Sequence, residues 1–297
     1  MSNPARTLQP AVLDLRPLHP RLGAELGGLH LAGSLDAAIV AALKAALLRH
    51  KVLFIRAQDH LDDAEHERFG ALLGDVVRHP AANHPTNINL IDGRKSWGRA
   101  NHWHSDATFK AAYPRATVIR AVDVPPTGGA TLWANTVTAY QDLPAPLQAL
   151  ADGLRAVHSN MGEFMAYRMD ADTEENRRFG RMFQSNAFYV EHPVVRVIAE
   201  TGERALLLSG YFKHIVGVSR DDSRSIHEML QRSVTRPENI LAWNWRPGDV
   251  AIWENRTTQH YATDNYGDFP RMMHSVQLNG DVPVGVDGVS SKVLEAP

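Results

Sequence analysis

Apolar side chains recur at helical spacing in two N-terminal segments and at strand spacing in most of the remaining chain. Residues 35–50, LDAAIVAALKAALLRH, predict an alanine-rich helix, and residues 51–56, KVLFIR, predict a short buried strand directly after it. Residues 61–74 predict a second helix, because acidic residues occupy its first turn and Gly74 follows its last apolar position.

Later in the chain the pattern changes to short β-like runs separated by Pro and Gly turns. These runs are INLI, ATVIRAVDV, PVVRVIA, RALLLS, DVAIW and MMHSVQL. The third and fourth runs predict a hairpin that turns at Thr201-Gly202. Helical inserts are predicted at about 143–156 and 221–234, and the residues after Gly285 are expected to form a loosely held tail.

This mixture of elements predicts a β-rich α+β fold. We expect a double-stranded β-helix, that is, a cupin-like jelly roll, with helices packed outside its two sheets. The chain contains no internal repeat and no convincing interdomain linker. Residues 1–297 are therefore expected to form a single domain.

Composition and charge exclude several classes of protein. The formal net charge of -2 gives no indication of nucleic acid or an anionic membrane surface as a partner. The absence of cysteine excludes disulfides, iron–sulfur clusters and thiolate zinc sites, so any metal must be held by His, Asp or Glu. No apolar h-region or membrane-spanning run is present, so we expect a cytoplasmic protein.

The stretch NHWHSDATF is the strongest candidate for part of a metal site. If it is extended, His104 and Asp106 point to the same side and can converge on one ion. His102 shares that side, either as a group behind the ligands or as part of a pocket wall. A second H-x-D triplet, at residues 60–62, starts a predicted helix, where its acid is explained as a first-turn charge.

Two ligands do not complete a site, and a non-haem iron triad requires a second histidine. His260, in GDVAIWENRTTQHYA, is the best candidate, although it lies 154 residues after Asp106. Further along, strand alternation places Arg271, Met273 and Ser275 on one face. A buried arginine needs an anionic partner, which can be the carboxylate of a ligand or a protein acid in a structural salt bridge.

Several long motifs occur in order, at compatible spacing, from about residue 12 to residue 284. They are WHSDATF, PPTGGATLWANTVTAY, EHPVVRV, WNWRPGDVAIWENRTTQHYA and PRMMHSVQLNGDVPV. Together they resemble those of the taurine dioxygenase and alkylsulfatase group of Fe(II)/2-oxoglutarate oxygenases, and the alkylsulfatase branch most of all. The resemblance implies an enzyme that uses Fe(II), O2 and 2-oxoglutarate to hydroxylate an aliphatic C–H bond of a small organic substrate, with release of succinate and CO2. It also implies a homo-oligomer, either a dimer or a tetramer.

The resemblance further implies roles for individual residues. His104, Asp106 and His260 would bind the iron, and Thr131 and Arg271 would hold the distal carboxylate of 2-oxoglutarate. Three substrate-site residues are predicted in addition, together with one tryptophan packed behind the iron ligands: His79, His102, Ser275 and Trp253. The segments 80–100 and 160–190 are expected to cover the pocket.

One position departs from the pattern of the taurine and alkylsulfate enzymes. Their strand after the 2-oxoglutarate arginine carries a second arginine, which binds the sulfur-oxygen head of the substrate, whereas this chain has Ser275. A charge-assisted hydrogen bond contributes roughly 1.5–3 kcal/mol, and arginine adds a fixed orientation that serine cannot supply. An alkyl sulfate or sulfonate is therefore one candidate substrate, and a carboxylate-bearing or amino-acid-like molecule is the other.

Two other classes of function remain open at this point. The first is a catalytically silent metal-binding jelly roll, although the complete set of expected ligands argues against it. The second is a Ser–His–Asp hydrolase that uses Ser105 or Ser209, although the chain has no nucleophile-elbow motif.

Overall fold

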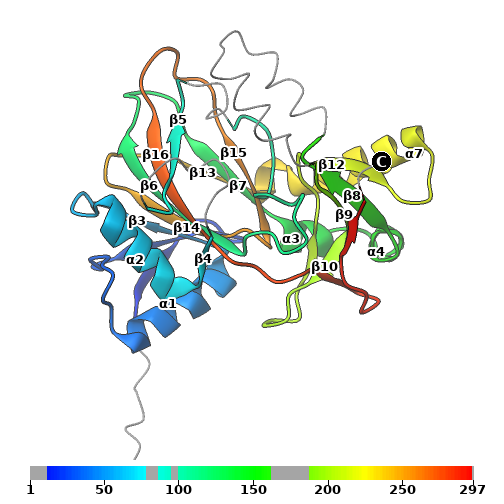
Figure 1. Cartoon of the computed structure of the whole chain (residues 1–297), viewed down its shortest axis with the longest axis horizontal. Coiled ribbons are helices and arrows are strands. Elements are labelled where there is room, and N and C mark those ends of the chain that lie inside the picture. Colours follow the sequence, from blue (N-terminus) through cyan, green and yellow to red (C-terminus); the bar gives the residue numbers. More distant parts are fainter. Residues whose placement is uncertain (1–11, 78–85, 95–99, 162–186, 296–297) are drawn as a thin grey trace, which may run out of the picture.

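The computed structural model describes residues 12–77, 86–94, 100–161 and 187–295. The largest sheet among them lies in one half of the molecule (Figure 1). In spatial order this sheet contains β1 (Asp14–Pro17), β2 (Ala24–Gly27), β3 (Val52–Ile55), β14 (Val250–Glu254), β6 (Ala116–Asp123), β16 (Met272–Leu278) and β4 (Val76–Val77), with β5 (Asn89–Asp92) also paired to β16. From β3 to β4, strands that are adjacent in this sheet are far apart in the sequence, as in a jelly roll.

A smaller sheet faces the large one. It is formed by β13 (Ile240–Trp243), β7 (Thr131–Asn135) and β15 (Thr258–Ala262), with β7 in the centre. Side chains of both sheets meet in one buried cluster that includes Phe54, Trp133, Trp243 and Trp253. The two sheets with this aromatic layer between them form the predicted jelly roll.

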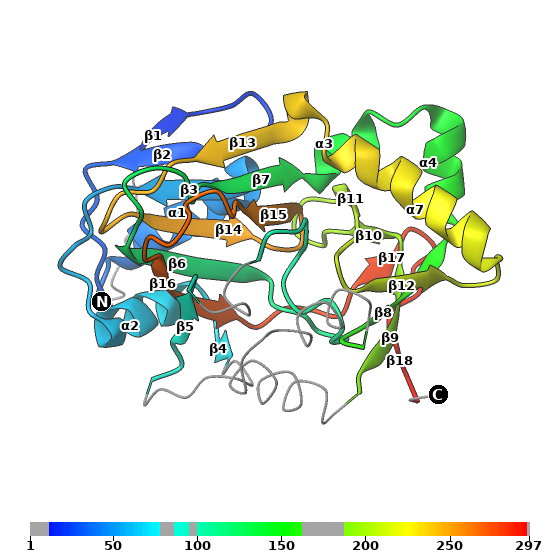
Figure 2. The same ribbon diagram turned by 90° about the horizontal axis from the view of Figure 1, so that it is seen from above.

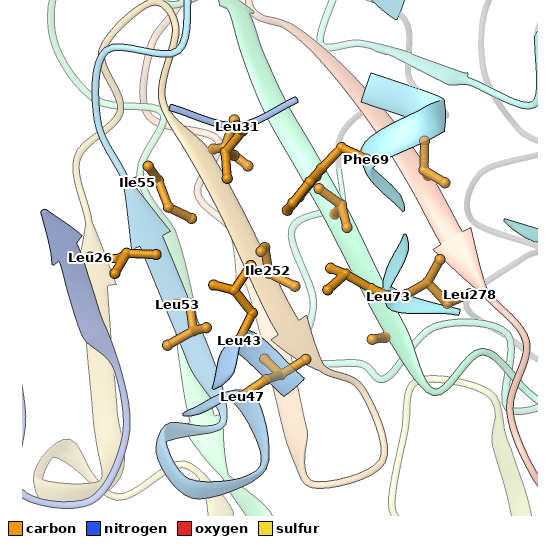
Figure 3. Packing of buried hydrophobic residues seen from close by; sticks show 14 of the residues in the cluster. Leu26, Leu31, Leu43, Leu47, Leu53, Ile55, Phe69, Leu73, Ile252 and Leu278 are labelled. Atoms are coloured by element: carbon orange, nitrogen blue, oxygen red, sulfur yellow. The ribbon is translucent and has the colours of Figure 1, made fainter. Parts of the chain in front are cut away.

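The outer face of the large sheet is covered by α1 (Ala37–His50) and α2 (Asp63–Leu73), as predicted. Each helix begins at an aspartate whose side chain accepts a backbone N–H: Asp36 from Ala38, and Asp62 from Glu65. Asp62 therefore serves as a helix cap, consistent with the structural interpretation of the triplet at 60–62. Figure 3 shows the leucine-rich layer between these helices and the sheet, to which Leu43, Phe69 and Ile252 contribute.

The other end of the molecule holds two small sheets and a group of helices (Figure 2). One sheet contains β12 (Phe212–Ile215), β8 (Arg155–Ser159), β9 (Tyr189–Pro193) and β18 (Lys292–Leu294); the other contains β11 (Arg204–Leu206), β10 (Val195–Val197) and β17 (Val284–Gly285). The helices described there are α3 (Thr136–Gln141), α4 (Ala145–Asp152), α7 (Arg220–Val234) and the 3-10 turn Pro237–Asn239. The predicted hairpin is confirmed, since β10 and β11 are antiparallel and Gly202 in their turn has a φ of 69°.

The predicted loose tail after Gly285 is wrong. Strand β18 pairs antiparallel with β9, and Arg155 donates a hydrogen bond of 2.8 Å from Nη2 to the Ser290 carbonyl. The segment gave no burial pattern to detect, because Val293 in the middle of the strand is 66% exposed. Backbone pairing to the edge of a sheet holds this segment without the burial of its side chains.

Among the described residues, no helix is long and apolar enough to cross a membrane.

Candidate metal centre

His104, Asp106 and His260 lie together between the two sheets of the jelly roll. Asp106 Oδ1 is 3.7 Å from Nε2 of His104 and 3.6 Å from Nε2 of His260. One ligand atom from each residue lies within 4.8 Å of the others. The predicted convergence is therefore present despite the long separation in sequence.

A two-residue bridge brings the distant histidine to the motif. The backbones of His104 and His260 exchange both of their hydrogen bonds, of 3.0 Å and 2.8 Å, as an isolated antiparallel pair. His260 also lies opposite Trp133 of β7, so its side chain is on the inner face of the small sheet. Ser105 extends the bridge, because its hydroxyl donates to the Thr258 carbonyl at 2.8 Å.

The predicted extended conformation of the motif holds only as far as this bridge. After Asp106 the chain enters a tight turn, in which Ala107 has a φ of 50° and the Lys110 N–H bonds to the Ala107 carbonyl at 2.9 Å. A residue with a Cβ rarely adopts such a φ, and this strain lies directly beside a candidate ligand. The turn, rather than a continuing strand, directs the aspartate toward the two histidines.

Two hydrogen-bonded neighbours fix Asp106, one at its carboxylate and the other at its backbone. Thr117, on the inner face of β6, donates from its hydroxyl to Oδ2 at 2.8 Å. Asn255 accepts the Asp106 N–H at 2.8 Å and donates to the Asp106 carbonyl at 3.2 Å. Because Oδ2 is occupied by Thr117, Oδ1 is the oxygen presented to the histidines, in the position of a monodentate ligand.

The turn that carries Asn255 is itself held by a buried ion cluster. Arg256, only 4% exposed, donates from Nε and Nη2 to the two oxygens of Glu254 at 2.6 Å and 3.1 Å. It also bonds to Glu200 and Asp281. Several charge-assisted hydrogen bonds thus fix the link between β14 and β15, and with it the start of the strand that carries His260.

The protonation of the histidines suits metal binding. His104 Nδ1 lies 2.9 Å from the His102 carbonyl; a carbonyl only accepts, so Nδ1 carries the proton and Nε2 offers its lone pair. Burial, and then the nearby His104, hold the pKa of His260 well below its usual 6.5, so its imidazole is neutral at pH 7. Trp253 packs near this ring, with centroids 4.8 Å apart. Two imidazoles and one carboxylate form the donor set that suits Fe(II).

Arg271 is buried at the Thr131 end of the small sheet, and no acidic partner of it is found among the described residues. Its guanidinium donates from Nε to the Gly129 carbonyl at 3.1 Å and from Nη2 to Thr131 Oγ1 at 3.2 Å. No carboxylate lies within ion-pair distance of it among the described residues, and burial lowers its pKa. The alternative of a structural salt bridge is thus not supported, and the site is suited to an anionic ligand.

The spacing between this arginine and the metal cluster follows from strand register. Thr131 lies opposite Ala262 and His260 lies opposite Trp133, so the threonine and the histidine are offset by two residues on the same face. Two residues along a strand span about 7 Å. A five-carbon dicarboxylic acid with one end at the metal can reach Arg271 with the other.

The structure describes two of the three predicted substrate residues, His102 and Ser275. The His102 ring is stacked on that of His104, with centroids 4.4 Å apart. Ser275 is 2% exposed on the inner face of β16, opposite Ile119 of β6 and Asn89 of β5. His79 lies outside the described residues, as do most of the segments expected to cover the pocket.

Three residues of the site were not identified from the sequence: Thr117, Trp245 and Asn255. Trp245 donates from Nε1 to Thr131 Oγ1 at 2.9 Å. In the sequence Thr117 has the pattern of an ordinary strand residue, and Trp245 that of a core aromatic. Only Asn255 gave a signal, as a polar residue directly after a buried strand.

The two serines of the hydrolase alternative serve the structure instead. Ser105 donates to the Thr258 carbonyl, and the Ser209 hydroxyl donates to the Ser105 carbonyl at 3.1 Å. Neither hydroxyl bonds to a histidine in the part of the chain that the structure describes, so the nucleophile–base pair that a hydrolase needs is not formed.

Known proteins resemble this chain over nearly its whole length. The family model described as "Taurine catabolism dioxygenase TauD, TfdA family" matches residues 14–277. An alpha-ketoglutarate-dependent sulfate ester dioxygenase of Pseudomonas putida is 48% identical, over 98% of this chain and 98% of that protein. An alkylsulfatase of Acinetobacter baylyi is 45% identical, over 98% and 91%. The crystal structure of a taurine dioxygenase from Burkholderia xenovorans, 38% identical, superposes with a TM-score of 0.80 over 96% of this chain and 97% of that one.

Proposed function

The chain belongs to the TauD, TfdA family of dioxygenases, and on that premise we propose that it is an Fe(II)- and 2-oxoglutarate-dependent dioxygenase that cleaves sulfate esters by oxidation. The observation that carries this proposal is the cluster of His104, Asp106 and His260. The names of the two relatives at 48% and 45% identity support a sulfate ester as the substrate class.

We assign the following roles to the chain's own residues. The two Nε2 atoms and Asp106 Oδ1 would hold the iron, which when bound supplies the activation of O2. Arg271 and Thr131 would bind the distal carboxylate of 2-oxoglutarate, which fixes the orientation of the cosubstrate at the metal. The burial of this arginine strengthens its attraction to an anion.

The proposed reaction balances without a further reductant. One oxygen atom of O2 enters a substrate C–H bond as a hydroxyl group, and the other enters succinate as 2-oxoglutarate loses CO2. If the hydroxylated carbon also carries a sulfate ester, the C–O bond to sulfate breaks, the hydroxyl group loses its proton, and an aldehyde forms. Sulfate and aldehyde are therefore expected as products alongside succinate.

A substrate panel tests this proposal. We expect alkyl sulfates to give succinate, sulfate and aldehyde in equal amounts when Fe(II), 2-oxoglutarate and O2 are present. His104→Ala and Asp106→Ala variants should abolish all three products. Coupled turnover with carboxylates or amino acids alone would favour the runner-up, a hydroxylase of such metabolites. No turnover with any compound, together with retained metal binding, would favour a silent metal-binding jelly roll.

Ser275→Arg tests how the substrate head is bound. If the sulfate lies against β16, this change should raise kcat/KM for medium-chain alkyl sulfates roughly tenfold or more, because a charge-assisted hydrogen bond contributes about 1.5–3 kcal/mol. Ser275→Met adds similar bulk without charge and controls for the tight packing of this position. An arginine variant that is no better than the methionine variant would show that the head group binds elsewhere.

Three broader features of the chain remain predictions. A single cooperative unfolding transition would support one domain over residues 1–297. Light scattering would test the dimer or tetramer. Cell fractionation would test the cytoplasmic location.

A further inference from the structure

The hydroxyl group of Thr131 has both of its acceptor positions filled. Arg271 Nη2 donates to it at 3.2 Å, and the indole Nε1 of Trp245 donates to it at 2.9 Å. A hydroxyl oxygen has two acceptor lone pairs and one proton, and neither guanidinium nor indole N–H can accept that proton. The Thr131 O–H must therefore point in the remaining direction, where no described residue accepts it.

We infer that Trp245 is a positioning residue for the cosubstrate: its indole N–H fixes the Thr131 hydroxyl as a donor toward the distal carboxylate of 2-oxoglutarate. This inference rests on the proposed function, because it concerns how the Arg271–Thr131 site recognises the distal carboxylate of 2-oxoglutarate. Without the indole, the hydroxyl could rotate and direct its proton away from the ligand. With it, the hydroxyl and the guanidinium both present donors to one anion.

The geometry around the arginine agrees with this assignment. Two of its three nitrogens are used within the protein, since Nε binds the Gly129 carbonyl and Nη2 binds Thr131. Nη1 makes no hydrogen bond among the described residues, so its two protons are available to a ligand. A carboxylate, which accepts and never donates when ionised, complements a hydroxyl proton and guanidinium protons held side by side.

The turn that carries Trp245 is rigid enough for this role. Trp243, the last residue of β13, lies opposite Thr131, so the indole two residues later reaches the same end of β7. Asp249 accepts the Arg246 N–H at 2.8 Å and also bonds to Arg56, whose Nη1 donates to the Asn244 carbonyl at 3.2 Å. These bonds fix the backbone on both sides of the indole before any ligand arrives, as preorganisation requires.

Ligand affinity separates this role from simple packing. We expect Trp245→Phe, in protein loaded with Mn(II), to raise the Kd for 2-oxoglutarate roughly five- to thirtyfold. The Kd for pyruvate, a 2-oxo acid without the distal carboxylate, should change less than twofold. Both constants are measured by calorimetric titration, which requires no turnover. Trp243→Phe is the matched control, because this tryptophan packs on Phe54 and donates no hydrogen bond to Thr131, and it should leave both constants within twofold of wild type.

A double-mutant comparison tests the route of the effect. If the indole acts through the threonine hydroxyl, Trp245→Phe should cost less than twofold in a Thr131→Val background. Three results would each overturn this inference alone. Trp245→Phe could weaken the binding of pyruvate as much as that of 2-oxoglutarate, or could weaken 2-oxoglutarate binding to the same extent in the Thr131→Val background. It could also leave the Kd for 2-oxoglutarate unchanged. Wild-type protein that binds Mn(II) but no 2-oxoglutarate would overturn the proposed function as well.

Discussion

At the scale of single residues, the site depends on which hydrogen bonds its ligands make with their neighbours. The His102 carbonyl fixes the tautomer of His104, and the Thr117 hydroxyl selects which Asp106 oxygen faces the histidines. Such neighbours orient ligands that would otherwise lose side-chain entropy on metal binding, and their removal typically lowers metal affinity about 10–100-fold. His104 and Asp106 are therefore each oriented by a hydrogen-bond partner.

Thr117→Val tests this dependence directly. The change keeps the shape of the side chain but removes the 2.8 Å bond to Asp106 Oδ2. We expect Mn(II) affinity, measured by electron paramagnetic resonance titration, to fall roughly 10–100-fold. Thr117→Ser keeps the hydroxyl and should stay near wild type. Equal affinity for all three proteins would mean that the aspartate needs no such support.

At the scale of elements, the turn between β14 and β15 joins the two sheets at the metal centre. Asn255 in this turn bonds to both backbone groups of Asp106 and to the Pro114 carbonyl, at 2.8 Å for the last. Arg256 ties the same turn to three acidic residues. The turn thus fixes the position of the metal motif relative to His260, although neither Asn255 nor Arg256 is a candidate ligand.

Asn255→Ala should affect both stability and metal binding. It leaves buried backbone groups without partners, so we expect a loss of about 2–4 kcal/mol in the free energy of unfolding and weaker Mn(II) binding. Asn239→Ala is the matched control: this residue is equally buried and its amide also makes three hydrogen bonds, but it lies in the 3-10 turn after α7. It should reduce stability similarly while leaving metal affinity unchanged. Weaker binding in both variants would point to general loosening of the fold.

At the scale of the whole molecule, three buried apolar clusters within the described ranges hold the sheets and helices together. Several histidines lie among or beside these clusters, with His66 and His192 fully buried, in surroundings that disfavour their charged form. Burial lowers the pKa of His66 to about 3, and of His192 and His227 to about 4. These residues couple the stability of the fold to pH.

The sign of this coupling follows from the direction of the shifts. Between pH 6.5 and 4 the unfolded chain binds a proton at each of these histidines and the folded chain does not, so stability falls as pH falls through this range. For His192 the loss reaches about 3 kcal/mol, since one pKa unit corresponds to about 1.4 kcal/mol. Urea denaturation at several pH values should show His192→Gln to be less pH-sensitive than wild type, whereas the same change at exposed His214 should leave the dependence unaltered. A steeper slope for His192→Gln would contradict the assignment.

The sequence by itself determined the elements whose signals are local. The two N-terminal helices, the hairpin at Gly202 and the alternation of β16 depend on neighbouring residues, and each was predicted correctly. The metal motif and its distant histidine could be named because their residue types limit the chemistry, with the family resemblance supporting the choice.

Tertiary structure alone decided how those residues are aimed. The bridge between His104 and His260, the choice of Asp106 oxygen by Thr117 and the contact of Trp245 with Thr131 join segments more than ten residues apart. The same holds for the last strand, which is held by backbone bonds to β9 that leave no mark on its side chains. Local patterns record burial and backbone preference, whereas hydrogen-bond direction between remote segments depends on how the folded sheets bring them together.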